Sequence, residues 1–78
     1  MTPQAEQTAA ILEQVIDTVD RIEDQTPDTY LKGEGFLDDV RSKAEDMLTG
    51  IEERETATDR QQQTANNWLS GVSKWDRT

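Results

Sequence analysis

Apolar residues recur at intervals of three and four positions along most of this 78-residue chain. That spacing gathers apolar side chains on one face of an α-helix, whereas a half-buried strand would alternate every second residue. The pattern therefore predicts an all-α fold. Because so short a chain holds one small domain at most, we treat 1–78 as a single helical domain.

The first helix is predicted over about 3–25. Thr2 suits the N-cap and Pro3 suits the first helical position. The helix should end before Pro27, because proline biases its preceding residue away from helical angles. A connector over 26–35 follows. The apolar stripe of this first helix consists of Leu12, Val15, Val19 and Ile22, widened by Ile11 and Ile16.

A second stripe starts at Leu37 and keeps one phase as far as Trp75, with no proline to interrupt it. Such continuity favours one long helix over about 36–76, and hence a helical hairpin. The alternative is a break near 55–59. There Thr58 and Gln61 have the spacing of a capping box, which would start a third helix and close a short three-helix bundle.

The C-terminal end of the predicted long helix carries both tryptophans of the chain. A first helix of this length covers only the first half of a straight second helix, so the tail would lack an apolar partner within the chain. Gly71 lies between the two rings, and a Trp75 ring tilted over it would leave a notch for close approach. We therefore predict an oligomer that associates through Trp68, Leu69, Gly71, Val72 and Trp75. In the alternative bundle, the tryptophans are buried within one chain.

The chain contains neither cysteine nor histidine. Disulfides, thiolate sites, the commonest metal ligand and the commonest general base are therefore missing. The stretch Asp24–Asp28 offers oxygen atoms at alternate positions, but Thr29 and Gly35 replace the glycine and the glutamate that a calcium loop requires. We predict no catalytic residue, no metal, no cofactor and no enzymatic activity.

Seventeen acidic residues against eight basic ones give a formal net charge of −9. This charge opposes binding to nucleic acid or to an anionic membrane, and it favours a basic protein partner. Strongly apolar residues never form a run longer than two, so we expect no membrane span or signal peptide and a cytoplasmic protein. Two acidic lines are predicted to face the partner: Glu13, Asp17, Asp20 and Asp24 on the first helix, and Asp38, Glu45, Glu52 and Asp59 on the second.

These features predict a non-catalytic interaction or adaptor protein that self-associates and binds a protein partner. One alternative is a small inhibitor, from a mobile element or phage, that mimics nucleic-acid charge. Carboxylates three or four residues apart on a helix lie about 5–6 Å apart, near the spacing of phosphates. Another alternative is a ligand-sequestering oligomer that stacks its ligand on the tryptophans, with Arg60, Lys74 or Arg77 nearby.

Overall fold

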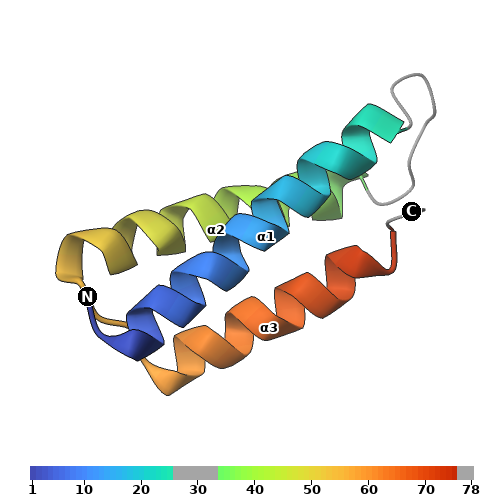
Figure 1. Ribbon diagram of the computed structural model, residues 1–78. Coiled ribbons are helices and arrows are strands. Elements are labelled where there is room, and N and C mark those ends of the chain that lie inside the picture. The colour runs from blue at the N-terminus through green and yellow to red at the C-terminus, as the bar shows by residue number, and fades with distance from the viewer. Residues whose placement is uncertain (26–33, 76–78) are drawn as a thin grey trace.

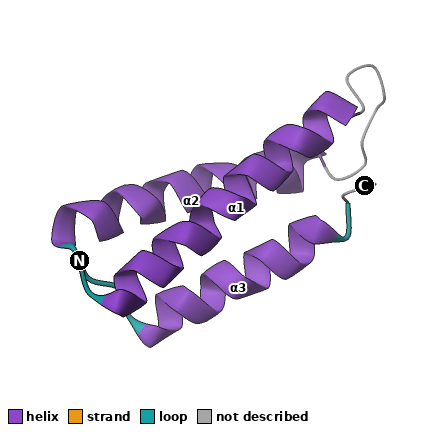
Figure 2. Cartoon of the chain, viewed as in Figure 1, coloured by secondary structure: helices purple, strands orange, loops and turns teal. Residues whose placement is uncertain are grey.

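The computed structural model of the protein describes residues 1–25 and 34–75. Within those residues the chain forms three helices: α1 (Pro3–Gln25), α2 (Glu34–Arg54) and α3 (Asp59–Ser73). The helices run up, down and up in one bundle (Figure 1). Figure 2 shows the short loop that joins α2 to α3. The all-α prediction is confirmed for this part of the chain, whereas the predicted connector over 26–35 lies outside the described residues as far as residue 33.

Helix α1 begins as its sequence predicts. The backbone N–H of Ala5 donates to Thr2 Oγ1 at 3.1 Å, so Thr2 caps the helix. One turn later the buried Thr8 hydroxyl donates to the carbonyl oxygen of Gln4 at 2.8 Å. That bond satisfies a polar group on the buried face of α1, which would be costly to bury unpaired.

The second helix is shorter than the favoured prediction. Helix α2 ends at Arg54 and α3 folds back, so the chain forms the bundle held as the alternative and not one helix over about 36–76. The turn needs neither glycine nor proline, because Glu55 itself adopts a left-handed conformation with φ 59°. This conformation costs a residue with a Cβ atom about 1–2 kcal/mol.

A capping box restarts the chain as α3. The Gln61 N–H donates to Thr58 Oγ1 at 3.1 Å, and the Thr58 N–H donates to Gln61 Oε1 at 2.9 Å. Folding back also buries Ala65 and Val72 completely, and a straight helix would leave both in water. Burial of a valine side chain is worth about 1.5–3 kcal/mol, which offsets the strain at the turn.

Helix α1 is the central element of the bundle. Both α2 and α3 pack along α1, while α2 and α3 barely touch each other. Consequently α1 supplies the largest share of the core, and a gap runs between the other two helices. The buried apolar residues are Ala5, Leu12, Val15, Val19, Ile22, Leu37, Val40, Ala44, Ile51, Ala65 and Val72.

Candidate functional site

Charge is unevenly divided among the helices. Helix α1 contains six acidic residues and one basic residue, α2 contains seven and three, and α3 contains one of each. The formal charges are therefore −5, −4 and zero, so the acidity of the protein belongs to α1 and α2. A basic partner would be drawn to those two helices and not to α3.

The acidic line predicted on α1 does face outward for most of its length. Glu13, Asp17 and Asp24 are exposed, whereas Asp20 is half-buried at the junction with α2. There Asp20 forms an ion pair with Arg41 of α2, with 3.0 Å between the carboxylate oxygen and the guanidinium nitrogen. Asp20 is thus already engaged within the chain, while the other three carboxylates are open to a partner.

The α2 line runs along the side of α2 that adjoins α1. Arg41 reaches Glu45 at 3.2 Å as well as Asp20, and so links the two acidic lines across the α1–α2 junction. Closer to the connector, Glu23 of α1 lies beside Asp38 of α2. Partial burial, followed by the charge and hydrogen bonding of Asp38, raises the pKa of the Glu23 carboxyl above its ordinary value. The junction therefore brings like charges together.

One member of the predicted α2 line is displaced by the turn. Asp38, Glu45 and Glu52 are exposed on α2, but Asp59 is the first residue of α3. Its carboxylate accepts a hydrogen bond from the Gln4 side chain of α1. The prediction that all four acids form one line is wrong, because it assumed that the helix continues through residues 55–58.

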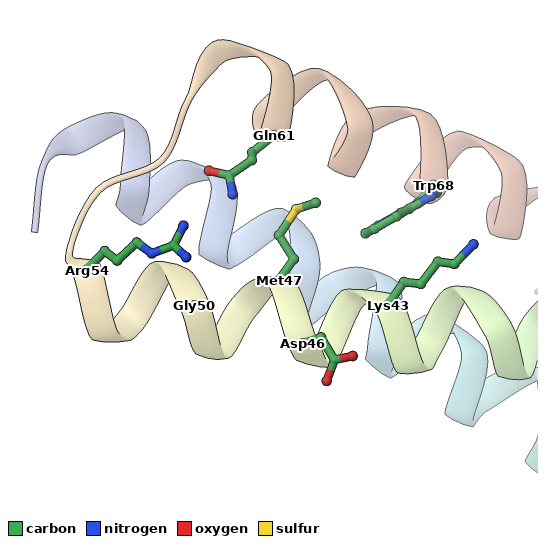
Figure 3. A pocket seen from close by; sticks show the side chains of 7 residues that line it. All are labelled: Lys43, Asp46, Met47, Gly50, Arg54, Gln61 and Trp68. Carbon is green, nitrogen blue, oxygen red and sulfur yellow. The ribbon is translucent and has the colours of Figure 1, made fainter.

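A groove of about 400 Å³ lies between α2 and α3, where those helices fail to pack against each other. Figure 3 shows Met47 of α2 and Trp68 of α3 pointing into the space between the helices, with Gly50 beside them. Two turns before Lys43 along α2, the Phe36 ring approaches α3: its Cζ atom is 3.5 Å from the position that a Cβ on Gly71 would occupy. The Trp68 ring, the Met47 thioether and Gly50 make the middle of the groove apolar.

Charged and amide groups surround that apolar middle. Lys43, Asp46, Arg54 and Gln61 complete the lining, and Figure 3 shows the Asp46 carboxylate pointing away from α3. Lys43 is paired with Asp39 at 2.9 Å, whereas Arg54 has no ion pair within residues 1–25 and 34–75. The groove thus carries more positive charge than the rest of α2.

The C-terminal cluster predicted to mediate self-association is divided by the fold. Val72 is fully buried in the core, so it is not available to another chain. Trp68 and Leu69 are half-buried and pack against that core, and Trp75 remains 36% exposed. Leu69 lies on the other side of α3 from the groove, in a polar depression with Gln14 and Ser73. Trp68 is the member of the predicted set that lines the groove.

Sequence reasoning misses the part that α2 contributes to the groove. The apolar stripe predicted from Leu37 onward includes Met47, which does pack partly against the core, but it gives Phe36, Lys43 and Gly50 no role. The sequence does contain a pattern that could have revealed this side of α2. Intervals of seven, four and three place five residues on one side of the helix: Phe36, Lys43, Met47, Gly50 and Arg54. Arg77, which belongs to the ligand-binding alternative, lies outside the described residues.

Comparisons with protein-family models, with curated proteins and with solved structures find no match for this chain. No helix in the described part of the chain is long and apolar enough to cross a membrane. Among residues 1–25 and 34–75, no three acidic side chains are placed to hold a metal ion together. Functional inference therefore depends on the two surfaces described above, the acidic exterior of α1 and α2 and the α2–α3 groove.

Proposed function

We propose that this protein is a non-catalytic interaction module of the cytoplasm that binds a basic protein. The binding surface is the acidic layer, defined as Glu13, Asp17 and Asp24 of α1 together with Asp38, Glu45 and Glu52 of α2. The observation that carries the proposal is the confinement of the net charge to α1 and α2, with α3 neutral. A protein that needed acids only for solubility would have no reason to segregate them.

Three features support the acidic layer as a partner surface. All six carboxylates are exposed, including Glu45, which shares Arg41 with Asp20, and the two rows lie on helices joined through that arginine. The layer also adjoins a contact between like charges, because burial and then the charge of Asp38 raise the pKa of the neighbouring Glu23 carboxyl. A surface of one sign speeds association with an oppositely charged partner and suppresses wrong ones.

The proposal includes self-association through the least acidic side of the bundle, which contains Trp68 and the groove. Small domains without disulfides or metals often draw stability from a partner subunit. Burying the acidic layer between copies would oppose association, so the neutral α3 and the adjoining groove are the favourable contact.

A second candidate is mimicry of nucleic-acid charge, favoured by the two acidic rows running along adjacent helices. In this case the basic partner is itself a nucleic-acid-binding protein. The two candidates differ in one outcome, because a mimic must be displaced from its partner by DNA or RNA in competition.

The test begins with purification of the tagged protein from its native cells and identification of the bound protein. Binding to that purified partner is then measured for two triple variants: Glu13→Gln, Asp17→Asn, Asp24→Asn on α1, and Asp38→Asn, Glu45→Gln, Glu52→Gln on α2. At least one should bind about tenfold more weakly or worse, chiefly through slower association, and show a smaller dependence on salt.

Asp59→Asn is the matched control, because it also removes an exposed charge but lies outside the acidic layer. Its affinity for the partner should equal that of the wild type. If both triple variants fold and bind as tightly as the wild type, the acidic layer is not the partner surface and the proposal fails.

A further inference from the structure

Gly50 has no structural role within a single chain that requires glycine. It lies in the interior of α2, where glycine destabilises a helix relative to alanine. Its φ is not in the left-handed range, and a Cβ atom built on it would meet nothing within 4 Å. Neither backbone conformation nor packing inside the bundle requires glycine here. A glycine on an open helix face permits close approach of something outside the chain.

Two opposite charges flank Gly50 symmetrically. Asp46 lies four residues before it and Arg54 lies four residues after it, and all three line the groove. When two antiparallel helices cross at one residue, positions equally distant from the crossing lie opposite each other. A second α2 crossing at Gly50 would therefore set Asp46 of each copy against Arg54 of the other.

We propose that the groove is the docking site of a second copy of this chain, with the two α2 helices crossing antiparallel at Gly50 about a two-fold axis. This inference rests on the self-association included in the proposed function, and it names the surface and the geometry. In a two-fold contact one patch must be complementary to itself. The sequence Asp46–Gly50–Arg54 meets that requirement by its own symmetry.

The rest of the groove fits the same occupant. Met47 and Trp68 supply apolar and aromatic surface for the centre of the contact, the kind of residues that carry binding energy in interfaces. Phe36, 45% exposed, extends the apolar surface along the same side of α2. None of the acidic layer lines the groove, and its α2 residues lie on the other side of α2, so this arrangement leaves both acidic layers open to partners.

Charge reversal with complementation tests the crossing. Asp46→Arg and Arg54→Asp are purified separately and studied by sedimentation beside the wild type, which should sediment at twice the monomer mass of 8.9 kDa. Each variant alone should dimerise at least about tenfold more weakly, because each brings two like-charged pairs together. Mixing the two should restore a dimer, since one then presents two basic groups and the other two acidic groups.

The matched controls are Glu52→Arg and Arg60→Asp, which make the same changes of charge at exposed positions outside the groove. Both should dimerise like the wild type. Gly50→Leu is a second, uncharged variant that fills the crossing point: it should lose the dimer while its helical content, measured by circular dichroism, stays the same. If the helical content is retained, the loss of the dimer is due to blocked docking and not to unfolding.

The outcomes separate this inference from the proposed function. A wild-type dimer that both charge variants leave intact would overturn the crossing at Gly50 while self-association through another surface stands. A wild-type protein that is monomeric to millimolar concentration, or that carries a different protein or a small molecule in the groove, would overturn the second copy as occupant. Binding of the basic partner by the acidic layer is measured independently and is affected by neither result.

Discussion

The two sides of α2 present a sharp contrast within one helix. The side next to α1 carries Asp38, Glu45 and Glu52, and Arg41 ties it to α1 through Asp20. The side next to α3 carries Phe36, Lys43, Met47, Gly50 and Arg54, and it borders the groove because α3 hardly touches it. On the acidic side, α2 has α1 as its neighbour and its carboxylates face water. The other side has an apolar middle that no element of the bundle covers.

This contrast shows that the number of apolar residues on a helix side does not reveal which side the bundle leaves uncovered. The groove side of α2 contains only two large apolar residues, Phe36 and Met47, so a search for an apolar stripe passes over it. What distinguishes it is a missing neighbour, combined with a glycine that the bundle does not use. The acidic side is distinguished instead by its exposed carboxylates and by the Glu23–Asp38 contact, where burial and then the charge of Asp38 raise the pKa of Glu23.

The largest expected effect separates the two sides of α3. Trp68→Ala removes the ring that lines the groove and should weaken dimerisation by about 2 kcal/mol or more, as loss of a central aromatic typically does. Leu69→Ala should lower the free energy of unfolding by a similar amount of about 2 kcal/mol but leave the dimer constant unchanged, because Leu69 faces away from the groove. Sedimentation and urea denaturation measure the two quantities. Equal loss of dimer in both variants would contradict the contrast between the groove and its surroundings.

A smaller effect tests the turn on which the groove depends. Glu55→Gly should raise the free energy of unfolding by about 1 kcal/mol, because glycine adopts the left-handed conformation without a Cβ penalty. A continuous helix through residues 55–58 predicts the opposite sign, since glycine inside a helix costs about 1 kcal/mol relative to alanine. Urea denaturation of the two proteins at equal concentration distinguishes these outcomes. Destabilisation would remove the basis for separate α2 and α3 helices.

The smallest expected effect concerns the junction of α1 with the acidic side of α2. The folded pKa of Glu23 is raised above its ordinary value of 4.5, so the folded state holds that proton more tightly than the unfolded chain does. Its contribution to stability is therefore present below pH 4.5 and is lost as the pH rises through the folded pKa. Glu23→Gln, which stays uncharged, should raise the melting midpoint at neutral pH by on the order of 2 °C.

Well below pH 4.5 the two proteins should melt together, because Glu23 is then protonated in both states. Arg41 limits the size of the effect, since its positive charge opposes the rise in the pKa of Glu23. Thermal melts followed by circular dichroism across this range supply the measurement. A Glu23→Gln protein less stable than the wild type at neutral pH would show that the carboxylate is favourable there, and that the charges at the junction attract more than they repel.

The helical periodicity was sufficient to predict much of the fold. The all-α class, the extent of α1 and its cap at Thr2 follow from local chemistry, because capping and amphipathic spacing act within one or two turns. The capping box of Thr58 and Gln61 was also visible in the sequence. The apolar spacing nevertheless favoured its competitor, one long helix. Which of the two forms depends on the apolar surface that α3 buries against α1, and that burial is a property of the tertiary structure.

The amino-acid sequence by itself determined which residues are acidic and that neither cysteine nor histidine chemistry is available. Only the tertiary structure decided which surfaces those residues form. It moved Asp59 out of the acidic line, buried Val72 and left Gly50 facing open space. The physical reason is that one helical stripe can be covered by a neighbour from the same chain or left uncovered, and spacing along the sequence is the same in both cases. Coverage is decided by where the chain turns back, here at Glu55.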